Sequence, residues 1–364
     1  MLRLEPREGR PATPAESHDN PRGTTTAVTA VMRQLLPLLL LAPAAACTDT
    51  VTTTEDRAYA ISASGDTVIV AAATETTTEG GGLGFGCGGP GIDLGPSVLF
   101  VSADAGATFE RIAPADDRPL TRIAVRSGVF YALAQEPSGE FSVVTSRDGR
   151  TWTEIPDARR VSNTISVHGD DVLVAHAQGL LASTDGRTFR DTRVTRDEWG
   201  LYLPLVARVG ETTVVASQHS SELHLSSNAE TWTTHQLDGS IEQLIPTSDG
   251  LYFAGYQATT YGGGTPVIGR IDLTNPRLVT SSAANSTHAV LTPAGILDGS
   301  GALHPLSPTG LGAPTNVTTD FTAGAADGNR VTLLDEGRVR TSIDGGRTFG
   351  ASVELPIERI VTRD

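Results

Sequence analysis

Short apolar runs separated by polar turns recur along the chain from about residue 57 to its end. The clearest set consists of Leu120–Val125, Val129–Ala134, Phe141–Thr145 and Trp152–Ile155, which together occupy roughly 40 residues. Each run is alternating or continuously apolar, and long helical periodicity is absent from this part of the chain. The pattern therefore predicts short β-strands grouped in repeating units of four.

Five related stretches, which we call the box turns, join the third and fourth strands of these units. They span residues 102–109, 146–152, 183–189, 226–232 and 342–349, each running from Ser to a Thr followed by Phe or Trp. Their third positions are Asp104, Asp148, Asp185, Asn228 and Asp344. An Asp in a turn accepts hydrogen bonds from nearby amides, and Gly supplies any positive φ angle. The aromatic residue suits burial between sheets, so the five Asp or Asn side chains are assigned a structural role.

The spacing of the box turns predicts the number of units. Successive Ser-to-Ser intervals are 44, 37, 43 and 116 residues, and the last interval spans about three periods. Two units without a box turn are therefore expected at 240–280 and 281–317. The prediction is an all-β fold, a seven-bladed β-propeller of four-stranded antiparallel blades, although rings of six or eight remain open. Residues 354–361 are expected to pair with the first blade and close the ring.

The box turns resemble the Asp-box (BNR) repeats, Ser-x-Asp-x-Gly-x-Thr-Trp/Phe, of sialidases and many non-sialidase β-propellers. The first and last copies have the full spacing, the copies at Asp148 and Asp185 are one residue shorter, and the Asn228 copy has lost both Asp and Gly. In that family the box is a peripheral turn away from the ligand face. The resemblance therefore implies a fold and leaves the activity open.

The first 56 residues differ from the repeats. Residues 1–31 are rich in Pro, Thr, Arg and Glu and are predicted to be disordered or to be upstream sequence translated in error. Residues 32–46 predict a secretory signal peptide, because a positive start precedes a short apolar core and small residues. That core is too short to span a bilayer. Residues 47–56 are expected to be a polar tether and 57–364 the propeller.

A Cys directly after small residues resembles the bacterial lipoprotein box, which implies a lipid anchor at Cys47; ordinary cleavage after Ala46 remains open. Thr48 instead of Asp after this Cys resembles an outer-membrane address. The expected location is therefore the outer membrane, facing the periplasm or the cell surface, with membrane contact through the anchor only.

Composition excludes several functions. All 27 basic residues are Arg, so neither a phosphate-loop lysine nor a Schiff-base lysine exists. The formal net charge of −15 repels phosphate backbones, which argues against a nucleic-acid partner. His219, Glu222 and His224 lie close in sequence but are assigned to the surface, so no metal and no cofactor is expected.

Long loops on the face opposite the box turns are the expected ligand site, because a rigid scaffold positions them. One connection carries aromatic residues beside charges: Arg196, Asp197, Glu198, Trp199 and Tyr202. A second carries Tyr256 and Tyr261 beside three glycines. Packing of Trp199 on a neighbouring blade is the structural alternative. The Gly-rich loop around Cys87 is interpreted as an insertion.

The predicted function is a monomeric, non-catalytic module that binds a protein or glycan at the cell envelope. The alternative is an exo-sialidase-like glycoside hydrolase, which the resemblance suggests. That family binds the substrate carboxylate with three arginines. Arg122, Arg208 and Arg359 lie near predicted inner strands, but no residue order favours these three, and no Tyr/Glu nucleophile pair is evident. The chain is thus expected not to be an enzyme.

Overall fold

The computed structural model describes residues 50–80, 91–114, 118–160, 162–194, 201, 203–258, 264–307 and 310–363. All regular elements in these ranges are β-strands, and they form seven antiparallel sheets of four or five strands, which we number as blades 1 to 7, plus one short hairpin. Blade 1 contains β1 (Thr50–Ser64), β2 (Thr67–Gly80), β3 (Gly91–Ser102), β4 (Glu110–Ile112) and β31 (Arg359–Arg363).

Blades 2, 3 and 4 are built from consecutive strands. Blade 2 contains β5 (Leu120–Arg126), β6 (Val129–Gln135), β7 (Phe141–Ser146) and β8 (Thr153–Arg160). Blade 3 contains β9 (Ser162–His168), β10 (Asp171–His176), β11 (Gly179–Ser183) and β12 (Arg190–Arg193). Blade 4 contains β13 (Pro204–Val209), β14 (Thr212–Ser217), β15 (Glu222–Ser226) and β16 (Thr233–Gln236).

Blades 5 and 6 are the two units without a box turn, at the predicted places. Blade 5 contains β17 (Gly239–Thr247), β18 (Gly250–Ala258), β19 (Gly264–Asp272) and β20 (Arg277–Ala283). Blade 6 contains β21 (Ala289–Thr292), β22 (Gly295–Asp298), β23 (Ala302–His304) and β26 (Thr315–Asn316), and a hairpin of β24 (Leu306–Ser307) and β25 (Gly310–Leu311) precedes its last strand. Blade 7 contains β27 (Ala323–Asp327), β28 (Arg330–Asp335), β29 (Arg338–Ser342) and β30 (Val353–Glu354).

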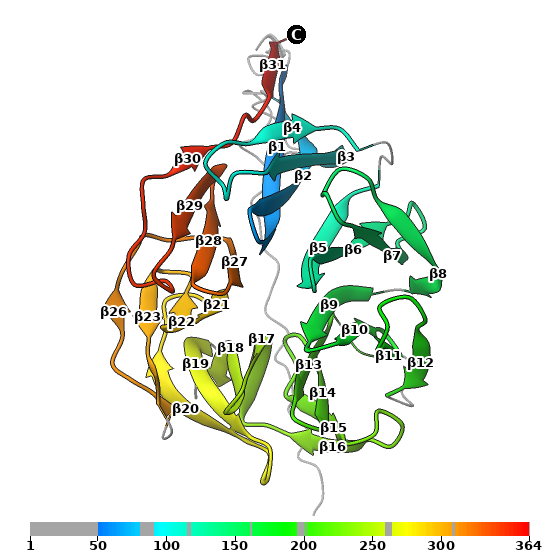
Figure 1. Ribbon diagram of the computed structural model, residues 1–364, viewed down its shortest axis with the longest axis vertical. Coiled ribbons are helices and arrows are strands. Elements are labelled where there is room, and N and C mark those ends of the chain that lie inside the picture. Colours follow the sequence, from blue (N-terminus) through cyan, green and yellow to red (C-terminus); the bar gives the residue numbers. More distant parts are fainter. Residues whose placement is uncertain are drawn as a thin grey trace, which may run out of the picture.

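The blades radiate around a common centre (Figure 1). The first strand of each blade lies nearest the centre and the fourth lies at the rim, in the order of the sequence. This arrangement confirms the predicted all-β propeller, and the seven sheets correspond to the seven predicted units.

Seven apolar clusters hold the blades together, and each is shared by two neighbouring blades. Phe100 of blade 1, for example, packs in one cluster with Leu334 of blade 7, and both are fully buried. The middle strands face a neighbour on both sides, which explains their continuous apolar runs, such as the five successive buried residues from Phe130 to Ala134. The cluster that contains Phe100 and Leu334 joins the last blade to the first, so the packing closes the ring.

The C-terminal strand β31 adds a second closure. It pairs antiparallel with the start of β1, from Val51 opposite Arg363 to Glu55 opposite Arg359. Of the predicted segment 354–361, residues 359–361 therefore pair with the first blade, whereas Glu354 belongs to β30 of blade 7. The expected tether over 47–56 is wrong for residues 50–56, which are part of β1. Four of these seven residues are Thr and one is Val, β-branched types that favour extended backbone, and Val51 to Glu55 have strand partners on both sides. Figure 1 shows this end of blade 1 projecting beyond the ring.

Candidate functional site

The box turns owe their two lengths to their backbone conformations. In the eight-residue turns two successive residues have positive φ, Ala105 (63°) and Gly106 (87°) in one and Gly345 (78°) and Gly346 (90°) in the other. The seven-residue turns have one such residue, for example Gly149 at 71°. A single left-handed residue therefore replaces a pair, and the turn becomes one residue shorter.

The carboxylates of the box turns bind within their own turns. Asp104 accepts hydrogen bonds from the hydroxyls of Thr108 (2.6 Å) and Ser102 (2.7 Å) and from the Thr108 amide (2.8 Å). These bonds, the Thr108 hydroxyl foremost, lower the pKa of Asp104 to about 2. Asp344 has the same three partners in Ser342 and Thr348, and its pKa is also lowered, chiefly by the Thr348 hydroxyl.

The aromatic residue that ends each box turn contributes to an inter-blade cluster. Phe109, Trp152, Phe189, Trp232 and Phe349 are each half-buried against the cluster that their blade shares with the preceding one. The first turn also meets the β1–β2 hairpin, since the amide of Ala105 donates to the Asp66 carbonyl at 2.8 Å. Box turns and first hairpins therefore share one face of the ring, which we call the box face.

Of the residues predicted to bind ligand, only Tyr256 lies within the described parts of the chain. It is half-buried near the end of β18 and pairs with Ser240 and Pro266 across the sheet. The remainder lie outside the described residues, as does the predicted anchor: Arg196, Asp197, Glu198, Trp199, Tyr202, Tyr261 and Cys47.

The three arginines considered for a carboxylate-binding triad lie on three different blades. Arg122 lies on the inner strand β5, whereas Arg208, at the end of β13, pairs with Asp171. Arg359 lies on β31, at the projecting end of blade 1, 3.5 Å from Glu55, so its expected place on an inner strand of the ring is wrong.

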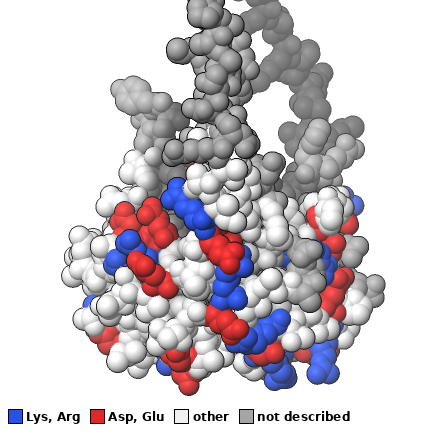
Figure 2. Space-filling view, turned by 90° about the horizontal axis from the view of Figure 1, so that it is seen from above, with Lys and Arg blue, Asp and Glu red and all other residues white. Residues whose placement is uncertain are grey.

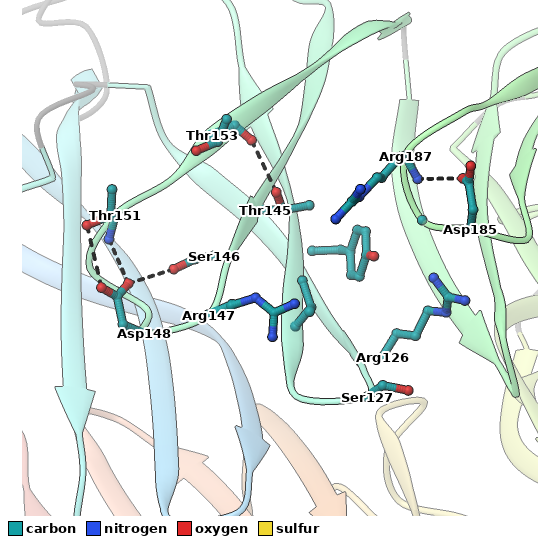
Figure 3. A pocket seen from close by; sticks show the side chains of 13 residues that line it. Arg126, Ser127, Thr145, Ser146, Arg147, Asp148, Thr151, Thr153, Asp185 and Arg187 are labelled. Atoms are coloured by element: carbon teal, nitrogen blue, oxygen red, sulfur yellow. Dashed lines mark hydrogen bonds between the residues drawn. The ribbon is translucent and has the colours of Figure 1, made fainter.

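A cavity of about 570 Å³ opens on the box face between blades 2 and 3 (Figure 3). Its walls come from the box turns of both blades, from the β5–β6 turn and from residues of β6, β7 and β8. The buried Tyr131 forms part of the wall together with the hydroxyl-bearing Ser127, Thr145 and Thr153. Sequence reasoning missed this cavity because it looked for the ligand on the opposite face.

Three arginines line this cavity. Arg147 and Arg187, one from each box turn, point toward one another across it (Figure 3). Neither guanidinium has a hydrogen bond or ion pair with any residue that the structure describes. Arg126 donates through Nη2 to the Thr184 carbonyl at 2.8 Å and lies 3.7 Å from the exposed Asp170, while its buried Nε atom has no partner in the described chain.

Gly186 keeps part of the cavity open. Its φ is 69°, and a Cβ atom added there would lie 2.0 Å from the hydroxyl of Tyr131 and 2.6 Å from Nη1 of Arg126. Any other residue would therefore collide with both side chains. The glycine lets the box turn of blade 3 approach Tyr131 and Arg126 closely.

Within the described ranges, no cluster of three or more His, Cys, Asp or Glu side chains is arranged to hold a metal ion. Nor does the described chain contain a helix long and apolar enough to cross a membrane. Figure 2 shows basic and acidic side chains interleaved on the face seen there, with no large patch of one sign.

Fold and packing define the chain as a β-propeller. No protein-family model and no curated protein sequence matches it. Among solved structures it is similar to YCF48 from Cyanidioschyzon merolae, with 12% identity over 82% of this chain and 85% of that one and a TM-score of 0.42. It is also similar to AztD from Citrobacter koseri (14%, 86% and 98%, TM-score 0.38) and to the Pan2 WD40 domain of Neurospora crassa (14%, 77% and 86%, TM-score 0.47). At these scores the assignment of the fold rests on the sheets themselves.

Proposed function

We propose that this chain is a non-catalytic propeller of the Asp-box type that binds a protein partner through the edge of β31. The observation that supports the proposal is the free edge of this strand. One edge pairs with β1, and no described strand pairs with the other. An exposed strand edge presents unpaired amides and carbonyls, to which an extended peptide can add as a further strand.

The side chains of β31 fit such a partner. Ile360 and Val361 are 60% and 49% exposed, unusual for large apolar residues in this chain. They are neighbours in a strand, so they point to opposite faces of the sheet and offer apolar contacts on either side of an added strand. A glycan has no main-chain amides with which to continue a sheet, so a protein suits this edge better.

The absence of catalysis is part of the proposal, and the position of the polar groups supports it. The box-turn carboxylates bind to their own turns, and Arg122, Arg208 and Arg359 lie in different parts of the fold. Hydrolysis of a fluorogenic sialoside, abolished by Arg122→Ala, would contradict it. No turnover across a panel of glycosides is the expected result.

A lipid on Cys47 would place β31 close to an outer-membrane surface. Two residues, Thr48 and Asp49, separate Cys47 from Thr50, the start of β1, and the three Cα–Cα steps between them span at most about 11 Å. The projecting end of blade 1 would then face the membrane, and the partner would be a protein at that surface. Labelling with an alkyne fatty acid tests the anchor: wild type should be labelled and Cys47→Ser should not, and an unlabelled wild type would contradict it.

Site-specific photo-crosslinking tests the binding edge. A photoreactive amino acid is placed at Ile360 in one variant and at Ile343 in another; Ile343 is 81% exposed and lies in the box turn of blade 7, on the box face. In envelope preparations the variant at 360 should form a discrete adduct with a protein, and the variant at 343 should not. Equal adducts at both positions, or none at 360, would refute the proposal.

A further inference from the structure

We propose that the cavity between blades 2 and 3 binds the phosphate group of a small phosphomonoester or of free phosphate. This site lies on the box face and is independent of the edge strand β31. Arg147 and Arg187 supply two guanidinium groups that point into the same space from neighbouring blades (Figure 3). Guanidinium groups bind phosphate through paired, charge-assisted hydrogen bonds, so two of them suit a dianion.

In the parts of the chain that the structure describes, eleven arginines have an ion pair with Asp or Glu, whereas Arg147 and Arg187 have none. Arg150, in the same box turn as Arg147, binds Glu110 of blade 1 at 2.5 Å, and Arg190 of blade 3 binds Glu230 of blade 4. In each pair the first partner, Glu110 or Arg190, directly follows the aromatic residue of a box turn. The second partner, Arg150 or Glu230, directly follows the residue with positive φ in the box turn of the next blade.

At the cavity this pattern is broken. Arg187 occupies the second position of the pattern in blade 3, but the matching position in blade 2 is Thr153, which has no charge. Arg187 therefore lacks the acidic partner that Arg150 has in Glu110. Its positive charge remains available to a ligand.

The two aspartates that line the cavity form no ion pair with Arg147 or Arg187. Oδ1 of Asp148 accepts from the amides of Arg150 (2.8 Å) and Thr151 (2.9 Å), and Oδ1 of Asp185 accepts from the amides of Arg187 and Thr188, both at 2.7 Å. Their carboxylates are thus directed into their own turns. Arg126 adds a third positive charge, and its partner Asp170 is 84% exposed to solvent.

The dimensions indicate the kind of ligand. A volume of about 570 Å³ lies in the range of sites for small organic molecules, which is about 300–1,000 Å³. A phosphate group fills only part of this space. The hydroxyls of Ser127, Thr145 and Thr153 and the ring of Tyr131 remain to contact a polar organic group attached to it.

Calorimetric titration in a low-salt Tris chloride buffer tests the proposal, with inorganic phosphate, glucose 6-phosphate and glucuronate as probes. Wild type should bind both phosphate probes, and glucuronate, a monoanion, more weakly. Tighter binding of glucose 6-phosphate than of phosphate would identify an ester as the source, and equal binding would identify free phosphate. No heat with either phosphate probe, or tighter binding of glucuronate, would overturn the proposal.

Two matched pairs of substitutions separate the site from general charge. Arg147→Gln with Arg187→Gln should weaken phosphate binding by about tenfold or more. Arg150→Gln with Arg190→Gln removes the same charge from the same two segments but leaves the cavity intact, so it should change the affinity less than about threefold. Equal losses in the two pairs would overturn the proposal.

A third variant tests the broken pattern without removing an arginine. In Thr153→Glu a carboxylate should pair with Arg187, as Glu110 pairs with Arg150, and phosphate binding should fall by about tenfold. Thr153→Gln, of the same size and without charge, should retain binding. Unchanged affinity in Thr153→Glu would contradict the assignment, while thermal unfolding of each variant confirms that the fold is retained.

Discussion

Asp56 and Arg111 connect the innermost and outermost strands of blade 1. Nε of Arg111 donates to Oδ2 of Asp56 at 2.7 Å and Nη2 donates to Oδ1 at 3.1 Å, while the amide of Glu358 also donates to Oδ2 at 3.1 Å. The Asp56 side chain is almost fully buried. One carboxylate therefore holds β1, β4 and the segment that leads to β31.

Removal of this carboxylate should weaken the closure of the ring. Asp56→Ala leaves the Arg111 guanidinium and the Glu358 amide without their partner, and we expect the free energy of unfolding to fall by about 3 kcal/mol. Glu110→Gln, which breaks an exposed pair with Arg150, should cost at most about 1 kcal/mol. Urea denaturation measures both, and equal effects would show that the Asp56 contact does not stabilise the fold.

Acid should weaken the box turns. Hydrogen bonds from Thr108 and Ser102 lower the pKa of Asp104 from 3.8 to about 2 in the folded chain. A carboxyl group with a lowered folded pKa contributes stability above its unfolded pKa and loses it as the pH falls through the folded value. Asp104→Asn should therefore lower the denaturation midpoint at pH 7, and the difference from wild type should shrink between about pH 4 and pH 2.

The exposed Asp320, outside the box turns, is the matched control for this titration. Asp320→Asn should leave the denaturation midpoint nearly unchanged at pH 7 and throughout the acid range. A difference between wild type and Asp104→Asn that stays constant over the same range would contradict a role for the ionised carboxylate.

A single substitution in the degenerate box turn of blade 4 should stabilise the protein. Ala229 has a φ of 56° where the other seven-residue turns have Gly. This conformation costs a residue with a Cβ about 1 kcal/mol, so Ala229→Gly should stabilise the protein by about 0.5–1 kcal/mol. The reverse change, Gly186→Ala, should destabilise it by more, because the added Cβ meets Tyr131. Thermal unfolding of both variants distinguishes this account from one in which the turns are unstrained.

Much of the fold could be predicted from the sequence because its signals are local. The box turns mark the third connection of five blades, and apolar runs such as Leu251–Tyr256 mark the strands of blades without a box turn. The sequence does not reveal the start of β1, because six of the seven residues 50–56 are polar. They form a strand through their pairing with β2 and β31, and β31 lies about 300 residues away in sequence.

The cavity could not be predicted in the same way. Arg126, Arg147 and Arg187 come from three turns in two blades, and they converge only because the blades are neighbours in the ring. The absence of an acid at Thr153 becomes informative only when the Glu110–Arg150 pair of the preceding boundary is known. The relevant signal in the sequence was the presence of arginines inside two successive box turns.

Disulfide trapping of the two ends tests the closed ring most directly. In a background with both native cysteines replaced by Ser, Thr53→Cys is combined with Val361→Cys, since these residues are directly opposite in the β1–β31 pair. Thr53→Cys with Arg359→Cys, two residues out of register, is the control. A closed ring should give rapid, near-complete formation of the first disulfide and little of the second. Equal or absent crosslinking in the first pair would contradict a ring whose terminal strands close on each other.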